Sequence, residues 1–313
     1  GIFFDANDIA QALRNITRAI AAEPFDGELR LFKARIYLAD NKYDEALDTL
    51  DEMQKVLPDA FEAYDLRAQI YSGIGKYEEA LKVSEDGCNR FPDDAYLTLT
   101  KLKVLVEMTK DQEAAELIAK MKTNGQFDKV MKEAVIQESI LFLRKEDTES
   151  TLKILLEANT ALGGDTDILY LIMDIYGKSE NYEKTMEIAD LLVGMNPGEY
   201  YESTARYFHA HSLDKLGKAD EAKAEYRKLT SILRKATINN PSFYEGYIYR
   251  LLSHTRLGEY DKALELANYM ENLYPDRADA HAFRHFIYKE QGDGAKAEES
   301  KNAALQINPN MSL

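Results

Sequence analysis

Apolar residues recur along most of this chain at the spacing of an amphipathic helix. Tyr64, Ala68 and Tyr71 fall on one stripe, because residues three and four apart share a helix face. Tyr77 and Ala80 begin a second stripe of the same kind. The alanines are small enough to let two helices approach closely, and the aromatic rings fill the space beside them. The pattern predicts an antiparallel helical hairpin.

Two residues mark the ends of these helices. Gly75 lies between the stripes, where a helix commonly ends in a left-handed residue that glycine adopts without strain. Pro92 lies where the second helix must stop, because proline lacks the amide hydrogen that a helix needs. One hairpin cannot bury its apolar face alone, so we expect it to stack on copies of itself.

The same signature returns at a fixed interval. Pro24, Pro58 and Pro92 are 34 residues apart. The interval recurs in three further sets, namely Ala12, Ala46 and Ala80, then Ala263 and Ala297, and finally Pro275 and Pro309. Because the period persists near both ends, it predicts repeats over nearly the whole chain.

The order aromatic, small, aromatic, Gly, aromatic, Ala, Pro resembles the tetratricopeptide repeat family. One unit carries it in full, as Tyr64, Ala68, Tyr71, Gly75, Tyr77, Ala80 and Pro92, and partial matches cover nearly the whole chain. The resemblance implies an all-α fold. It would be an α-α superhelix, a right-handed solenoid of about eight to nine antiparallel helical hairpins.

We expect residues 1–313 to form a single solenoid with four segments. These are a partial first unit at 1–24, regular units at 27–124, a degenerate unit at 125–164, and C-terminal units at 165–313. The last helix is polar, as a capping unit requires. Residues 7–23 look like a second helix alone. Either a first helix was removed upstream, or Ile2, Phe3 and Phe4 take its place.

Three stretches interrupt the regular period. Residues 123–127 and the pair Gly163–Gly164 break the phase, and residues 232–242 indicate a lengthened helix and loop. One repeat also has Thr109 near the place where others have glycine. Insertions of this kind change the local curvature of a solenoid, and one of them could act as a hinge.

In the family, the first helix of each hairpin lines the concave face of the superhelix. Carried over by repeat frame, the predicted peptide-binding residues are Tyr170, Tyr207, His211 and Phe286, with Phe208, Tyr249 and Phe283 at neighbouring positions, and Tyr96, Arg35 and Lys103 in the N-terminal half. Tyrosine and phenylalanine give large contact area at low conformational-entropy cost, which is typical of binding hot spots. The alternative is that these rings pack between adjacent hairpins.

Some family members clamp the carboxylates of a chaperone tail with Lys and Asn. Arg35 and Lys103 occupy comparable places and could hold a carboxylate, but Asp65 lies between them. We therefore predict that this chain is not a receptor of that kind.

Net charge narrows the class of partner. The chain has 39 basic and 55 acidic side chains, for a formal charge of −16. An acidic surface disfavours nucleic acid and anionic membranes, and it permits a neutral or basic polypeptide. The alternative is that the charge only keeps an extended molecule soluble. We expect a protein or peptide partner, no nucleic acid, no direct membrane insertion, and a monomer or weak homo-oligomer.

The sequence contains no catalytic motif, and we predict no enzyme activity. It has no phosphate-binding loop and no nucleophile elbow. His281 and His285 have the spacing of two metal ligands, but no third ligand is indicated, so we predict no metal and no cofactor. His254 is expected to be a hydrogen-bonded core residue. The single cysteine, Cys88, is expected to be a small buried apolar residue.

Three functional hypotheses remain open. The first is a scaffold that binds a peptide along the concave face, the second is a sensor that closes around a peptide, and the third is the interaction arm of a larger protein or enzyme. The chain shows no signal peptide and begins at Gly1 rather than Met, so we expect a processed or truncated protein. Its compartment is unknown: cytoplasmic by default, or exported or membrane-tethered if an upstream segment was removed.

Overall fold

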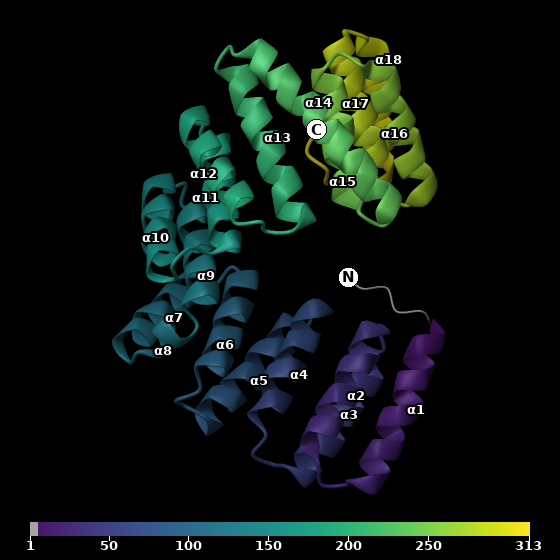
Figure 1. Ribbon diagram of the computed structural model, residues 1–313. Helices are drawn as coiled ribbons and strands as arrows, with labels where there is room; N and C mark the ends of the chain where they lie inside the picture. The colour runs from purple at the N-terminus through teal and green to yellow at the C-terminus, as the bar shows by residue number, and fades with distance from the viewer. Residues whose placement is uncertain (1–5) are drawn as a thin grey trace. The chain divides into compact units, whose positions relative to one another are not determined.

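The computed structural model describes residues 6–313, and the expectation for Ile2, Phe3 and Phe4 lies outside them (Figure 1). The chain divides into two compact units, and the boundary along the sequence lies between Ala158 and Asn159, inside the segment predicted to be degenerate. The predicted all-α fold is confirmed, while the single continuous solenoid and its four segments stay predictions.

The first unit contains helices α1 to α9 and most of α10. They are α1 (Ala6–Ala22), α2 (Gly27–Ala39), α3 (Tyr43–Val56), α4 (Phe61–Gly73), α5 (Tyr77–Arg90), α6 (Ala95–Glu107), α7 (Asp111–Thr123), α8 (Gln126–Lys129), α9 (Met131–Arg144) and α10 (Thr148–Ala161). From α1 to α9 each helix contacts the next, and first helices also contact one another, as α4 contacts α6.

The second unit contains four hairpins. They are formed by α11 (Thr166–Lys178) and α12 (Tyr182–Gly194), α13 (Glu199–Lys215) and α14 (Ala219–Asn239), α15 (Tyr244–Arg256) and α16 (Tyr260–Leu273), and α17 (Asp279–Gln291) and α18 (Gly294–Ile307). Helix α13 contacts α11 and α15 as well as its own partner α14. No helix in the described part of the chain has the length and apolar character needed to cross a bilayer.

The hairpin of α4 and α5 forms as its sequence predicts. Ala68 and Ala80 are fully buried where the helices approach each other. Gly75 adopts φ +75° in the turn, and its amide donates to the Ser72 carbonyl. An acidic residue caps several first helices, as when the Asp94 carboxylate accepts from the Leu97 amide at the start of α6.

The lengthened helix predicted near residues 232–242 is present, and the break at 123–127 contains a short helix that was not predicted. Helix α14 is 21 residues long and ends at Asn239, which accounts for the lengthened helix and loop at 232–242. At 123–127, α7 ends and the short helix α8 follows. Gln126 of α8 is buried, and its side-chain amide donates to the Pro92 carbonyl at 2.9 Å. The phase break therefore contains one extra helical turn, which packs onto the loop between α5 and α6.

Candidate functional site

Aromatic side chains gather on the first helices of the second unit. We call this set the aromatic surface, and its members are Tyr170, Tyr200, Tyr201, Tyr207, Phe208, His211, Tyr249, Arg256 and Phe286. They lie on α11, α13, α15 and α17. Because α13 contacts both α11 and α15, residues from separate repeats meet there.

A tyrosine trio joins α11 to the start of α13. The Tyr170 ring lies 6.0 Å from Tyr200 and 5.6 Å from Tyr201, and these two lie 5.0 Å apart in an edge-to-face arrangement. The Tyr201 hydroxyl donates to the Asp167 carboxylate. Burial, and then a hydrogen bond with Tyr200, raise the pKa of Tyr170 above its usual range. Tyr170 is therefore uncharged at neutral pH, and the trio presents rings and hydroxyls.

Tyr207 forms the centre of a second aromatic group. Its ring is 5.3 Å from Tyr249, 6.2 Å from Phe208 and 5.9 Å from Tyr226 of α14. It is only 9% exposed and belongs to the core between α13 and α14. Tyr207 therefore packs in the core between hairpins, which is the alternative that the sequence left open. Its ring supports those of Phe208 and Tyr249, which remain half-buried.

His211 extends this group along α13. Its ring stacks on Tyr207 at 6.0 Å with the planes 4° apart, and its Nδ1 is buried with no hydrogen-bond partner among the described residues. Burial, with a smaller contribution from nearby Arg256, lowers the pKa of His211 to about 4. The ring is thus neutral at physiological pH and behaves as another aromatic group.

Arg256 links Phe286 to the same surface. Its guanidinium lies 5.2 Å from the Phe286 ring and 3.4 Å from the Glu290 carboxylate. The guanidinium also lies near enough to the Tyr207 hydroxyl to lower its pKa, against the larger raising effect of burial. Since Glu290 balances its charge, Arg256 adds a fixed hydrogen-bonding bridge rather than a free cation.

Close packing fixes two other predicted residues. The Phe208 ring lies against Gly177 of α11, where an added Cβ would come within 3.0 Å of it, so the absent side chain makes room for the ring. Phe283 packs half-buried against the core of α15 and α16. Phe283 is therefore held in the hairpin core beside Ile287 rather than within the aromatic surface.

The N-terminal predictions lie in the first unit, on α2 and α6. Tyr96 is 60% exposed on α6, Arg35 is exposed, and Lys103 is half-buried. Asp65 is already engaged, because it accepts hydrogen bonds from Gln69 at 2.9 Å and from Thr100. These residues give one exposed ring and scattered charges.

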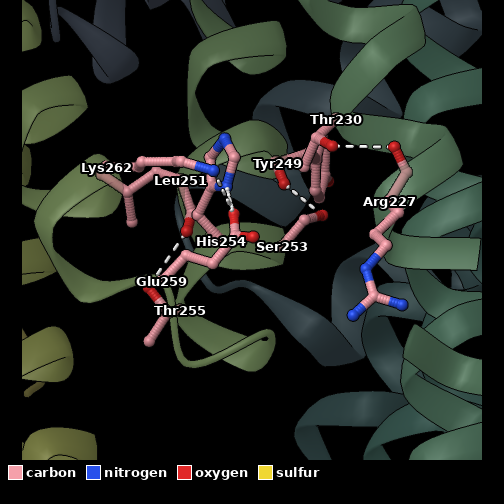
Figure 2. Close-up of polar contacts among 9 residues, drawn as sticks. All are labelled: Arg227, Thr230, Tyr249, Leu251, Ser253, His254, Thr255, Glu259 and Lys262. Atoms are coloured by element: carbon pink, nitrogen blue, oxygen red, sulfur yellow. Dashed lines mark hydrogen bonds and ion pairs between the residues drawn. The ribbon is translucent and has the colours of Figure 1, made fainter. Parts of the chain in front are cut away.

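The histidines have structural partners. Figure 2 shows His254 of α15 with the Glu259 carboxylate at 2.6 Å, and Lys262 meeting the same carboxylate at 3.1 Å. The prediction of a hydrogen-bonded core histidine is confirmed. His281 lies beside Arg284 and Glu271, and His285 Nδ1 donates to the Ala297 carbonyl at 2.8 Å. Within residues 6–313, no group of three candidate metal ligands comes together.

Sequence reasoning missed three members of the surface. Tyr200 and Tyr201 lie in the first turn of α13, which starts earlier than a standard repeat helix and therefore fell outside the repeat frame. Arg256 is the last residue of α15. The available signal was the helical spacing of Tyr200 and Tyr207, which are seven residues apart and share a helix face.

Comparison with protein families finds one family. Two models described as tetratricopeptide repeat match the chain, one at residues 3–70 and the other at residues 61–94 and 203–233. No curated protein sequence matches it. The matched residues include the complete signature of α4 and α5 and also the α13–α14 hairpin.

The solved structures that match this chain have low sequence identity to it. A chain of the APC/C hetero-tetramer Cut9–Hcn1 is 14% identical with a TM-score of 0.54, over 97% of this chain and 57% of that chain. A tetratricopeptide repeat protein from Parabacteroides merdae is 14% identical with a TM-score of 0.47, over 91% of this chain and 94% of that chain. A chain from the structure of Naa15/Naa10 bound to HypK-THB is 14% identical with a TM-score of 0.38, over 97% of this chain and 62% of that chain. The present chain thus spans little more than half of the first matched chain, with which it shares the helical-repeat fold.

Proposed function

Because the chain belongs to the tetratricopeptide repeat family, we propose that it is a non-catalytic scaffold that binds a polypeptide on its aromatic surface. The observation that carries the proposal is the meeting of half-buried rings from separate repeats along first helices that contact one another. Rings of this kind offer large contact area and lose little entropy on binding.

The charge state of the surface indicates the chemistry of the ligand. Burial raises the pKa of Tyr249 to about 12, and His211 is neutral above about pH 4. Arg256 is balanced by Glu290. The surface therefore carries little net charge at neutral pH. It suits apolar and aromatic side chains, with tyrosine hydroxyls available to peptide backbone groups.

Protein partnership is also in keeping with the fold neighbour. The matched chain was solved as part of a hetero-tetramer of Cut9 and Hcn1, an assembly of two kinds of protein. For the present chain we infer only the class of ligand, a neutral or basic polypeptide, because the acidic chain would repel an acidic one over most of its surface.

The test is an affinity pull-down from the source organism's lysate, analysed by mass spectrometry. The variant combines Tyr170→Ala, Tyr200→Ala and Phe286→Ala, and it keeps Tyr207 because removing a core ring would cost about 3–5 kcal/mol of stability. The control combines Phe25→Ala, Tyr77→Ala and Leu191→Ala, three exposed residues away from the first helices. Circular dichroism at 222 nm verifies equal helicity.

Partners that the native chain and the control retain, and that the variant loses, support the proposal and name the ligand. The proposal fails if the variant keeps every partner that the native chain captures. It also fails if the control loses them to the same extent.

A further inference from the structure

A pattern of oppositely charged pairs between neighbouring helices is interrupted at one interface. In several repeats a residue of a first helix pairs with the residue sixteen positions earlier, on the preceding second helix. Arg67 Nη2 lies 2.5 Å from the Asp51 carboxylate. Lys101 forms the same kind of pair with Glu85 at 3.1 Å. At another interface the acidic residue is on the first helix instead, as Glu138, and it pairs with Lys122 at 2.6 Å.

The α14–α15 interface has two arginines at these positions. Arg250 of α15 occupies the place of Arg67, and Arg234 of α14, sixteen residues earlier, replaces the acidic partner. The register is the same, because Arg67 also reaches Gln54, thirteen residues earlier, as Arg250 reaches Thr237. The Arg234 cation lies near enough to lower the pKa of Arg250, after the larger effect of burial.

No acidic side chain takes over the missing role. In residues 6–313, neither Arg234 nor Arg250 has a carboxylate within ion-pair distance, and only Tyr247 acts to raise the pKa of Arg250. The head group of Arg250 has one weak hydrogen bond, from Nη1 to Thr237 Oγ1 at 3.5 Å. Glu259, the residue that precedes α16, is already held by His254 and Lys262 (Figure 2).

At the next interface, between α16 and α17, the equivalent arginine has hydrogen-bond and ion-pair partners. Arg284 of α17 stands 34 residues after Arg250, and it donates to Asn268 at 2.7 Å and to the Glu271 carboxylate. Arg250 is half-buried and Arg234 is exposed, and two like charges held close together without a counter-ion favour the binding of an anion. The chain as a whole carries −16, so this cationic pair is a local exception.

We propose that Arg234 and Arg250 form an oxyanion-binding site at the interface of α14 and α15 in the second unit. The ligand is a carboxylate or phosphate group, which would occupy the place that an acidic side chain fills at the other interfaces. Each guanidinium presents a planar fork of N–H donors that suits either group. The site contains no residue of the aromatic surface and does not depend on its function.

The experiment is isothermal titration calorimetry of the full chain at constant ionic strength, with sodium chloride as the balancing salt. One titrant is inorganic phosphate and the other is acetate, which separates a phosphate ligand from a carboxylate ligand. The variant is Arg234→Glu, which supplies the acidic partner that Arg67 has. The matched control is Lys223→Glu, the same charge change on an exposed residue of α14, about 16 Å along the helix from Arg234.

We expect one binding site for at least one titrant in the native chain and in Lys223→Glu. We expect at least tenfold weaker binding in Arg234→Glu, because the new carboxylate pairs with Arg250 and replaces the ligand. That variant should unfold at an equal or higher urea concentration, which shows that the loss is not misfolding. Absence of binding in the native chain would overturn the proposal, and so would equal weakening by both variants or unchanged binding in Arg234→Glu.

Discussion

The turn between α6 and α7 holds a strained residue that a single substitution should relieve. Thr109 adopts φ +56°, a left-handed conformation, whereas the equivalent turn between α4 and α5 places Gly75 at φ +75°. A β-branched residue is especially disfavoured there, since its Cβ approaches the following carbonyl oxygen. The turn persists because the Thr109 amide donates to Val106 and the Lys110 amide donates to Leu105.

The expected gain follows from two opposing terms. A left-handed backbone conformation destabilises a residue with a Cβ by roughly 1–2 kcal/mol, and glycine removes this cost. Against this gain, glycine destabilises the folded state by about 0.5–1 kcal/mol, because its unfolded chain has larger entropy. Thr109→Gly should therefore stabilise the first unit by about 1 kcal/mol. For a folding unit of this size, that raises the unfolding temperature by about 2–4 °C.

Thermal unfolding followed by circular dichroism at 222 nm measures this change, and two variants isolate its cause. Thr109→Ala keeps the Cβ and should give no comparable gain. Gly75→Ala makes the converse change, and because no atom lies within 4 Å of the added Cβ, its expected loss of about 1 kcal/mol reports the backbone alone. Equal stability of Thr109→Gly and Thr109→Ala would refute the reasoning.

Three further predictions concern buried polar groups. Tyr226→Phe should stabilise the second unit by about 1 kcal/mol in urea unfolding, because the hydroxyl of this 1% exposed residue has no hydrogen-bond partner among the described residues; a loss of that size would contradict this. Because folding lowers the pKa of His211 from 6.5 to about 4, the unfolded chain binds the proton more tightly. The native chain should therefore lose about 1–2 kcal/mol relative to His211→Gln as the pH falls from 6.5 to 4, once partial exposure is allowed for, and the two should run parallel above pH 7; parallel curves throughout would exclude the effect. Burial raises the pKa of Cys88, so iodoacetamide at pH 7.5 should modify the native thiol several-fold more slowly than the urea-unfolded one, and equal rates would show that the thiol is not protected.

The local elements of the fold were predictable from the sequence. The stripe of Ala68 and Ala80, the turn at Gly75 and the lengthened α14 all depend on spacing and on backbone preferences that a few neighbouring residues determine. At Thr109 the turn forms at the same place in the repeat without glycine, so the spacing of the helices determines its position more than the residue type does.

The binding surface was less predictable, because it depends on contacts between repeats. Tyr207 fits the inward-facing frame, yet the rings of Tyr226 and Tyr249 and the core of α13 and α14 bury it. Tyr200 was missed because α13 begins earlier than the repeat frame. The lack of a counter-charge at Arg250 appears only when interfaces between repeats are compared.

The most direct test of the central claim is site-specific photo-crosslinking in cells of the source organism. A photoreactive benzoylphenylalanine replaces Tyr200 of the aromatic surface in one protein and Tyr77 of α5 in another; these residues are similarly exposed, at 40% and 37%. The account predicts a discrete crosslinked polypeptide at position 200 and none at position 77. Crosslinks to the same polypeptides at both positions, or at position 77 alone, would contradict it.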